Sequence, residues 1–596
     1  MRKFLPLLLC LGLACNLLTP RPTATPDTAT PVAFTPTRVE AGTQPPGPTS
    51  PAPARVESAT QPPIPRLPTP PITAVLPVTP PAPCVFQLAP EDVIVHPEPF
   101  LYSGDTVSVE VVVDTSCPEW QSATVALHAN ALATAPLATA TPGAYGLGGR
   151  LEAAFTWVWN TQQRVGPQTL IVEARPARSP GESVAASSVV TVTLDLLPAD
   201  QRPAPEAQAR WEVANSACCT IHYVSGTAAA RDITTIAAQA AAAQDKVKAK
   251  LGVTWNKPVG FTMLSRLLGH GGFATTSIDL TYIDRNPVGN NLFTIFTHEQ
   301  THILDSKLTA QRPALMAEGL AVYVAGGHFK PNEDLMQRAA ALLALGRYIP
   351  LGELADNFYP SQHETGYVEG GALVTYLVQT YGWDQFKQFY GSFRSGPDRH
   401  VLDTALQANF GKNLSQIEAD WLAALRARPP TPAQVDDLQL SIALYDTLRR
   451  YQTLDDPSAF YLAAWVPDTA EAFRRGLVAD YVRHPDSAEN IAIESMLADA
   501  EHVLEAGQYP QAEALLNSVN AVLESHNLFF DPLAARFLSI VNYLSALGYE
   551  AQTIDLDPTA PPADAVRVTA VRHWPTLETL TLTLSAGGWQ MVPAPG

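Results

Sequence analysis

The prolines of this chain are concentrated in one stretch that cannot fold by itself. The 596 residues include 54 prolines. The segment from Leu17 to about Pro83 consists largely of Pro, Thr and Ala, as in "TPRPTATPDTATPVAFTPT". It has too few large apolar residues to bury a core, and such sequences favour an extended polyproline II chain. We therefore predict a tether at residues 16–83 and expect the folded modules to begin at Cys84.

The N-terminus has the layout of an export signal. In "MRKFLPLLLCLGLACN" two basic residues precede an apolar run, and small residues precede Cys15. The run is too short to span a bilayer comfortably. "LGLAC" resembles a bacterial lipobox, with Gly12 where leucine is preferred. This resemblance implies a signal at residues 1–15, a lipidated Cys15 and a cell-surface protein that meets the membrane only through its lipid anchor. Plain secretion is the alternative.

Charge and cysteine content bear on partners and compartment. The net charge of -19 leaves no strongly basic surface for phosphates, so we expect no nucleic-acid partner. In an oxidising compartment Cys84 and Cys117 could form a disulfide. Cys218 and Cys219 are adjacent, and we expect two buried thiols there because bonding between neighbours strains the chain. The sequence does not indicate an oligomeric state.

Hydrophobic periodicity predicts a multidomain fold. Residues 84–198 contain short alternating segments such as "DTVSVEVVVDTS", which predict an all-β sandwich of Ig-like type. Residues 205–429 combine strand-like stretches with helical spacing, which predicts an α+β domain. Residues 430–548 are predicted to be helical, with one tetratricopeptide-like hairpin in "MLADAEHVLEAGQYPQAEALLNSVNAVLES". The alternation returns in residues 549–596 and predicts a small β-sheet there.

The segment "FTHEQTHILD" carries the chemistry of this chain. It lies in a predicted helix capped by Asn290 or Asn291. His298 and His302 are four residues apart, so they share one helix face and can direct two imidazole nitrogens at one point. Glu299 lies about 100° round the helix, where it can reach a water on the same ion. This arrangement suits a zinc hydrolase, in which zinc lowers the pKa of bound water. Two core histidines are the alternative.

A third ligand is predicted in "RPALMAEGLAVYV". Glu318 interrupts this apolar stretch, and Pro313 suits the first turn of a helix. A buried carboxylate needs a partner, and a zinc ion held by His298 and His302 would supply one. An exposed helix glutamate is the alternative.

These motifs resemble a known family. The pattern His298-Glu299-x-x-His302, followed by "EGLA" from Glu318, resembles the gluzincin metallopeptidases of the MA clan, most of all their peptidase MA-like bacterial branch. The resemblance covers residues 217–393. It implies a Zn²⁺ cofactor held by the two histidines and Glu318, with Glu299 as the general base.

Two positions depart from the family pattern. Leu315 stands where that branch often has tryptophan, which is an apolar exchange. Val322 stands where thermolysin-like relatives have an aspartate that orients a histidine ligand. That orienting role is therefore unassigned. Asp305 is a candidate for it, and a solvent-facing side chain is the alternative.

The resemblance also implies a group that stabilises the oxyanion. Tyr367 matches a tyrosine that opens the corresponding helix in the family, although it could equally serve packing. His363 is the second candidate, because thermolysin-like enzymes use a histidine for this task. The family pattern makes "SIDLTYID" the edge strand that pairs with an extended substrate. "GHGGFATT", just before it, is interpreted as a flexible loop.

We therefore predict a zinc metallopeptidase that hydrolyses peptide bonds at the cell surface. The absence of a Gly-x-Met-Glu-Asn-type motif argues against an exopeptidase. One alternative is an inactive surface protein whose peptidase-like domain serves binding or scaffolding. Another is hydrolysis of a non-protein amide, such as one in the cell wall. The sequence predicts neither the substrate nor the cleavage preference.

Overall fold

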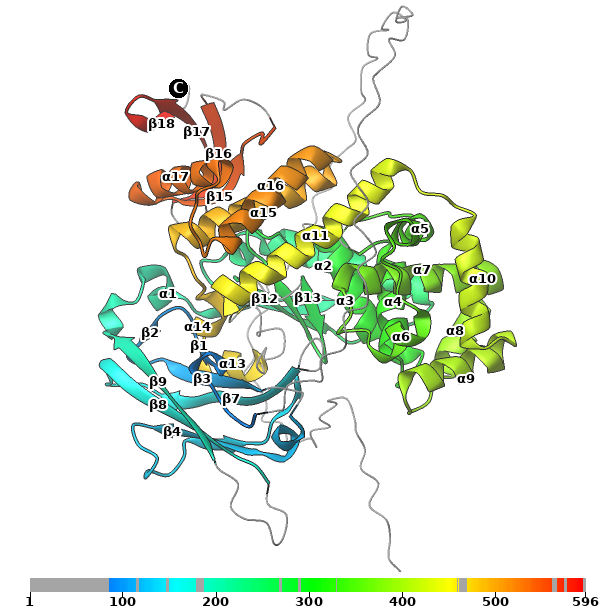
Figure 1. The fold of residues 1–596 in the computed structure, drawn as a ribbon, viewed down its shortest axis with the longest axis horizontal. Coiled ribbons are helices and arrows are strands. Elements are labelled where there is room, and N and C mark those ends of the chain that lie inside the picture. Colours follow the sequence, from blue (N-terminus) through cyan, green and yellow to red (C-terminus); the bar gives the residue numbers. More distant parts are fainter. Residues whose placement is uncertain are drawn as a thin grey trace, which may run out of the picture. The chain divides into compact units, whose positions relative to one another are not determined.

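The computed structural model describes residues 85–113, 117–145, 150–177, 187–266, 271–287, 291–328, 330–457, 459, 469–559, 565–572 and 576–592 (Figure 1). The predicted signal, Cys15 and the tether lie outside these residues. Among the described helices, none combines the length and apolar character needed to cross a membrane. Mixed sheets and helices fill the described chain, as the sequence predicts for a multidomain α+β protein.

The first module consists of two β-sheets. One sheet has the order β1 (Val93–His96), β3 (Thr106–Val113), β7 (Arg150–Asn160) and β6 (Gly143–Tyr145). The other has the order β2 (Leu101–Tyr102), β9 (Ser188–Leu197), β8 (Gly166–Arg175), β4 (Thr124–Ala129) and β5 (Ala138–Ala140). Alternate apolar side chains from both sheets, such as Val109 and Val172, are buried in one shared core. The period-two pattern of the sequence is therefore the pattern of inward-facing residues.

A mixed five-stranded sheet underlies the second module. Its order is β10 (Trp211–Asn215), β11 (Cys219–Val224), β12 (Val259–Leu264), β14 (Ile278–Thr281) and β13 (Gly272–Ala274). The three central strands are parallel, and the two outer strands run antiparallel to their neighbours. Both edges of this sheet are thus antiparallel strands.

The edge of this sheet differs from the prediction. "SIDLTYID" supplies β14, which is covered by β13 and is not an edge strand. The edge strand β13 comes from "GHGGFATT", for which the sequence predicts a flexible loop. A tight turn, in which the Thr275 N–H donates to the Ser277 carbonyl at 2.8 Å, folds β13 back along β14. A glycine-rich strand of three residues carries no alternation, so the sequence pattern did not show it.

Two helices cover one face of this sheet. The first, α2 (Ala228–Leu251), is followed by Gly252, which caps it in the left-handed conformation with a φ of 66°. The second, α3 (Leu292–Leu304), contacts the sheet through Phe296, whose ring centre lies 5.1 Å from that of Phe261 on β12. This packing fixes α3, the helix that carries the HExxH motif, against the sheet.

Two further helices meet through glycines. They are α4 (Ala314–Ala325) and α7 (His363–Tyr381). A Cβ added at Gly319 would lie 2.4 Å from the carbonyl oxygen of Gly370, so the two backbones touch. The bundle is completed by α5 (Leu335–Leu345), α6 (Leu351–Asp356), α8 (Trp383–Gly391), α9 (Asp398–Phe410) and α10 (Leu414–Arg426).

The helical core does not stop at residue 429. Leu438 and Ile442 of α11 (Pro432–Asp455) are buried in the same core cluster as α3 and α4. The chain continues through α13 (Thr469–Arg475), α14 (Ala479–Val482), α15 (Ala488–Glu505), α16 (Tyr509–Glu524) and α17 (Pro532–Ala546). It ends in an antiparallel sheet of β15 (Glu550–Asp555), β16 (Ala565–Val571), β17 (Leu577–Ser585) and β18 (Gly588–Val592). A second core cluster joins α15, α16 and α17 to this sheet.

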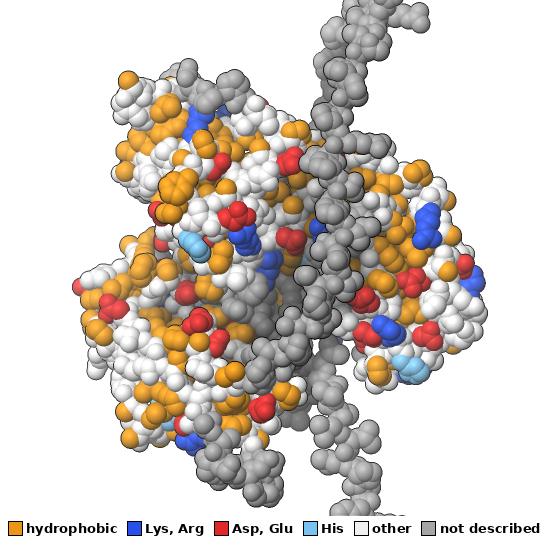
Figure 2. All heavy atoms as spheres, viewed as in Figure 1, with side chains coloured by type: hydrophobic (Ala, Val, Ile, Leu, Met, Phe, Trp, Pro, Cys, Tyr) orange, Lys and Arg blue, Asp and Glu red, His pale blue; other side chains and the backbone are white. Residues whose placement is uncertain are grey.

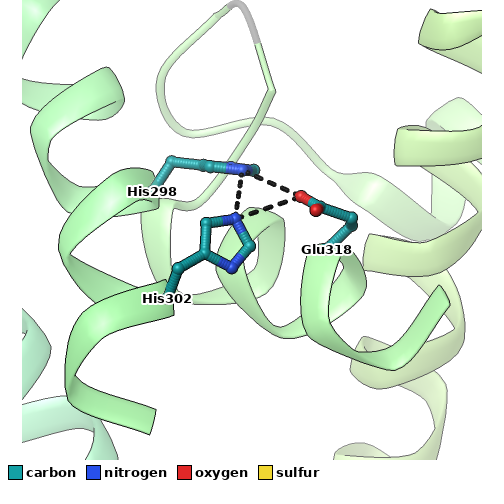
Figure 3. A group of neighbouring side chains, drawn as sticks. All are labelled: His298, His302 and Glu318. Carbon is teal, nitrogen blue, oxygen red and sulfur yellow. Dashed lines mark hydrogen bonds and ion pairs between the residues drawn. The ribbon is translucent and has the colours of Figure 1, made fainter. Parts of the chain in front are cut away.

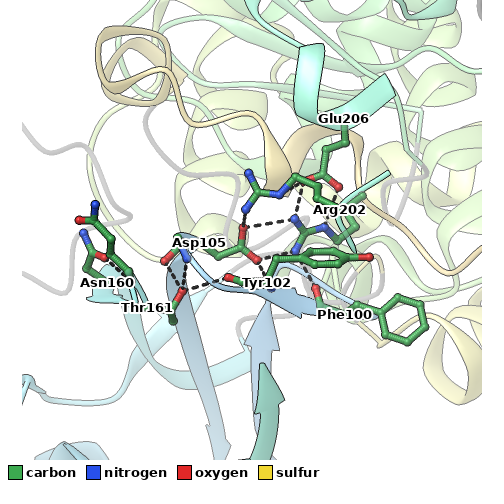
Figure 4. Close-up of polar contacts among 10 residues, drawn as sticks. Phe100, Tyr102, Asp105, Asn160, Thr161, Arg202 and Glu206 are labelled. Carbon is green, nitrogen blue, oxygen red and sulfur yellow. Dashed lines mark hydrogen bonds and ion pairs between the residues drawn. The ribbon is translucent and has the colours of Figure 1, made fainter. Parts of the chain in front are cut away.

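A buried group of ion pairs ties the first module to the chain beyond α14. Arg483 donates from Nη1 to Asp105 at 2.8 Å, and its Nη2 pairs with Glu206. Arg202 also binds Asp105, at 2.7 Å (Figure 4). Removing one member of such a group would leave a buried charge unpaired, at a cost of about 3–5 kcal/mol.

The cysteines differ in part from the prediction. Cys117 is disulfide-bonded, and its predicted partner Cys84 lies outside the described residues. Cys218 and Cys219 are bonded to each other, so the prediction of two buried thiols is wrong. Cys218 lies in a turn before β11, in which the Ser216 N–H donates to the Cys219 carbonyl at 2.8 Å. The alternation that separates neighbouring side chains in a strand does not apply in that turn.

The outer surface is chemically mixed. Figure 2 shows acidic, basic and apolar side chains interspersed over one face of the molecule. Folded proteins commonly expose scattered apolar groups, so this distribution identifies no binding surface by itself.

Candidate metal centre

Three side chains from two helices converge at one point (Figure 3). The Nε2 atoms of His298 and His302, one turn apart on α3, are 3.1 Å from each other. Oε2 of Glu318, on α4, lies 3.3 Å from the first nitrogen and 3.1 Å from the second. Asn291, one of the two predicted caps, precedes α3, and its Oδ1 accepts from the Thr294 N–H at 2.9 Å.

This triangle fits a metal ion better than it fits hydrogen bonds. Three mutual contacts among two imidazole nitrogens and one carboxylate oxygen need more protons than neutral rings supply. Ligand atoms bound to a tetrahedral zinc ion at about 2.0–2.1 Å lie roughly 3.3 Å apart. The observed separations of 3.1–3.3 Å match that spacing. Two imidazoles and one carboxylate also form the donor set of a catalytic zinc site, which leaves one position open.

Glu299 is buried beside this triangle, close enough for the charges of His298 and Glu318 to act on it. Only 6% of Glu299 is exposed to solvent, and burial raises the pKa of its carboxyl to about 7. A Cβ added at Gly272 on β13 would lie 2.6 Å from Oε1 of Glu299. The absence of a side chain at Gly272 therefore makes room for this carboxyl group at the sheet edge.

Tyr359 holds the third candidate ligand in place. Its hydroxyl donates to Oε1 of Glu318 at 2.8 Å, while Oε2 faces the histidines. Burial alone would raise the pKa of Glu318, but the charges and hydrogen bonds of His302 and His298 hold it well below the ordinary value. Sequence reasoning missed Tyr359, because it lies in the loop before α7 and shows no spacing relation to the motif.

Asp305 is buried and faces away from solvent. Its Oδ2 accepts from the Tyr390 hydroxyl at 2.6 Å, and its Oδ1 pairs with Arg312. Arg312 in turn donates from Nη2 to the backbone carbonyl of His302 at 3.1 Å. The solvent-facing alternative is therefore wrong, because both carboxylate oxygens have buried partners. Asp305 acts on the end of α3 through Arg312, and the described contacts include no bond from it to a histidine ring.

Val322 does not take an orienting role either. A Cβ added at Gly371 of α7 would lie 2.5 Å from Cγ1 of Val322. The residue therefore fills the contact between α4 and α7, and an apolar side chain is what that contact requires.

The two candidates for oxyanion stabilisation lie together at the start of α7. The ring centre of Tyr367 is 5.9 Å from that of His298. His363 lies one turn earlier on α7. Its ring centre is 4.3 Å from that of Tyr367 and 4.3 Å from that of Tyr445 on α11. The ring of Tyr367 thus neighbours that of a candidate ligand, and the ring of His363 neighbours that of Tyr367.

A second residue that sequence reasoning missed is His328. It follows α4, and its ring centre lies 6.1 Å from that of His298 and 4.4 Å from that of Tyr367. Two glycines and no recognisable motif precede it, so only the tertiary fold brings it to the centre.

A family model of the peptidase MA superfamily matches residues 263–427. This part of the chain is thus similar to the peptidase MA superfamily, in agreement with the resemblance seen in the sequence. The matched segment contains His298, Glu299, His302 and Glu318, and also Tyr359 and Tyr367.

Solved structures give further likenesses. An M1 zinc metallopeptidase from Deinococcus radiodurans shares 13% identity, over 56% of this chain and 92% of that chain, with a TM-score of 0.24. An aminopeptidase N family protein from Idiomarina loihiensis shares 11% identity, over 83% of this chain and 95% of that chain, with a TM-score of 0.21. No curated protein matches the sequence.

Proposed function

We propose that this protein is a zinc-dependent metallopeptidase that cleaves peptide bonds outside the cell. The observation that carries the proposal is the convergence of His298, His302 and Glu318 on one point, with the buried carboxyl of Glu299 beside it. The superfamily match over residues 263–427 supports the same reaction class.

Each of these residues has a distinct task. His298, His302 and Glu318 would hold the ion. A zinc ion held there would supply Lewis acidity and would lower the pKa of water at its open position towards neutrality. Glu299 takes a proton from the attacking water and delivers it to the leaving amine. Burial raises the pKa of this carboxyl, which favours uptake of the proton from water.

The substrate is proposed to bind along β13. This strand is an outer strand of its sheet, and Gly272 within it adjoins Glu299. An extended peptide can add to such an edge through backbone hydrogen bonds. The scissile carbonyl would then lie close to Glu299. Tyr367, with His363 as the second candidate, is proposed to steady the oxyanion.

The remaining assignments rest on the sequence. We propose export with a lipidated Cys15, a tether at residues 16–83, and an Ig-like module that spaces the peptidase from the membrane. A peptide or protein is the proposed partner. Neither the tether nor the anchor is among the described residues.

The proposal is tested on the purified full chain with two substitutions. Glu299→Gln should keep zinc, measured by elemental analysis, and should lower cleavage of fluorescein-labelled casein about 10²- to 10⁴-fold. His302→Ala should lose the zinc as well. Full activity of Glu299→Gln would refute the mechanism. Zinc binding without cleavage of any protein substrate would favour a non-protein amide or a binding role.

A further inference from the structure

The segment that carries α13 and α14 contacts both the first module and the mixed sheet of the second. It runs from residue 469 to residue 483. On one side, Oδ2 of Asp480 accepts from the indole Nε1 of Trp157 on β7 at 2.7 Å. On the other side, the carbonyl oxygen of Tyr481 accepts from the N–H of Ser265, directly after β12, at 3.1 Å. This bridging segment therefore joins the two sheets.

The side chain of Trp157 is turned out of its own module. Phe155 and Trp159 face the sandwich core, and the alternation of a strand would place Trp157 there as well. Its φ is instead 51°, and the pairing of β7 with β3 shifts register beside it. This bulge directs the ring outward, where it is buried with Ala472 and Tyr481. A bulky residue rarely adopts a positive φ, so the surrounding contacts must offset the strain.

The bridging segment lies on the face of the mixed sheet that is opposite α3. Phe261 of β12 faces α3, where it contacts Phe296, so the next side chain, Thr262, points to the other face. Asp279 of β14 is the cross-strand partner of Thr262 and shares that face. Oγ1 of Thr469 donates to Oδ1 of Asp279 at 3.2 Å. The segment therefore holds β14 from the side away from α3.

Further contacts extend this cover to the other end of the sheet. Nε1 of Trp211 on β10 donates to the carbonyl oxygen of Leu477 at 2.8 Å. The ring centre of His222 on β11 lies 5.1 Å from that of Phe473. Parallel strands are stable where both of their faces are covered. Here α2 and α3 cover one face, and the bridging segment covers the other.

The contact at β14 lies next to the proposed substrate edge. Asp279 is also the cross-strand partner of Phe273 on β13. Gly272, the preceding residue of that strand, adjoins Glu299. A displacement of β14 would therefore move β13 relative to the proposed general base. Small displacements of this kind are costly, because the reacting groups must be held in a narrow range of distances.

We propose that Trp157, Asp480 and Thr469 are positioning residues, through which the first module holds the substrate-binding edge of the catalytic sheet in place. The first module is then a working part of the peptidase as well as a spacer. This inference rests on the proposed peptidase function, because the edge has a task only if a peptide binds there. The support of β14 by the first module can be measured without that function.

Hydrogen exchange measures this support in the full chain without turnover. Trp157→Phe keeps an aromatic ring and removes the N–H that Asp480 accepts. It should speed amide exchange in residues 272–281 about 10-fold, because β13 and β14 then open more readily. Trp589→Phe is the matched control, since its indole donates to Oγ of Ser539 at 2.9 Å. An arginine also lies over each ring, at 5.4 Å and 5.5 Å. The control should leave exchange in residues 272–281 unchanged.

A second substitution acts at the other end of the bridging segment. Thr469→Val keeps the shape of the side chain and removes the hydroxyl that donates to Asp279. It should also speed exchange in residues 272–281. Both variants should lower kcat/KM on fluorescein-labelled casein about 10-fold without loss of zinc. Thr453→Val is the control, because that exposed hydroxyl bonds only the Arg449 carbonyl of its own helix among the described contacts, at 2.8 Å.

The two readouts separate this inference from the proposed function. Wild-type exchange in both Trp157→Phe and Thr469→Val would overturn the inference, whatever the activity. Faster exchange with wild-type kcat/KM would overturn the positioning role, because the reaction would then not need the support. If the wild-type chain cleaves no protein while both variants exchange faster, the peptidase function fails and the role in substrate binding fails with it, but the support of β14 stands.

Discussion

The hydroxyl of Tyr359 donates to the oxygen of Glu318 that does not face the two histidines, at 2.8 Å. This bond fixes the carboxylate so that Oε2 points at the candidate metal position. Removing a hydrogen-bond partner of a metal ligand lowers metal affinity about 10- to 100-fold, because the partner orients the ligand before the ion binds. The centre therefore depends on a loop residue as well as on its two helices.

Tyr359→Phe should weaken zinc binding about 10- to 100-fold and leave the fold intact, because 36% of the tyrosine is exposed. The measurement is a zinc titration against a competing chelator. Tyr348→Phe is the matched control, since the Tyr348 hydroxyl bonds Glu418, away from the centre. Unchanged affinity in Tyr359→Phe would show that the helices alone orient Glu318.

Gly272→Ala should displace the proposed general base. The added Cβ would lie 2.6 Å from Oε1 and 2.8 Å from Cγ of Glu299. A shift of about 1 Å in a catalytic group can cost roughly 100-fold in rate. We therefore expect kcat on fluorescein-labelled casein to fall about 100-fold, while zinc content measured by elemental analysis is retained.

The control for this substitution is Gly260→Ala in β12 of the same sheet. There the nearest side-chain atom, Cβ of Ser277, would lie 3.4 Å from the new carbon, which is close to ordinary contact. Its activity should stay near that of the wild type. If both variants lose activity equally, the sheet as a whole is sensitive to alanine, and the contact with Glu299 is not the cause.

Sequence patterns predicted those features that depend on local spacing. The four-residue spacing of His298 and His302 placed them on one helix face, and alternation in residues 84–198 predicted the strands. Glu318 was identified because it is a charged residue in an otherwise apolar predicted helix. Each of these signals arises within one element, where neighbours in space are a fixed number of residues apart.

The features that sequence reasoning missed are made by contacts between elements. Tyr359 and His328 come from loops, and their distance to the centre is set by how α4 and α7 pack. The burial of Asp305 depends on Tyr390, which is 85 residues away. The strand β13 is too short to show a period. None of these contacts has a sequence spacing from which it could be read.

Gly319→Ala should destabilise the contact that brings Glu318 and Tyr367 together. The new Cβ would lie 2.4 Å from a backbone oxygen of α7, which cannot move without separating the helices. Overpacking of this kind costs about 1–3 kcal/mol, which lowers Tm by several degrees. Thermal unfolding measures this effect. Gly391→Ala in α8, where the nearest atom would lie 3.4 Å away, should leave Tm unchanged or raise it. An unchanged Tm in Gly319→Ala would contradict the close approach of the two backbones.

Glu364→Gln should remove a component of stability that depends on pH. Burial alone would raise the pKa of Glu364, but the charge of Arg338 and the hydrogen bond from His328 hold it at about 2, below its ordinary value of 4.5. The unfolded chain therefore takes up a proton at a higher pH than the folded chain does. The stabilisation is complete above pH 4.5 and is lost as the pH falls towards 2. A shift of this size corresponds to about 3 kcal/mol at neutral pH.

Denaturant unfolding of the wild type and Glu364→Gln at several pH values between 3.5 and 7 measures this component. The wild type should be the more stable protein at pH 7, and the difference should narrow as the pH falls, because the ionised carboxylate is what Arg338 and His328 bind. The exposed Glu353 provides the control, and Glu353→Gln should differ little from the wild type at any pH in this range. If the difference for Glu364→Gln is the same at pH 3.5 and pH 7, the stabilisation does not come from the charge that Glu364 presents to Arg338 and His328.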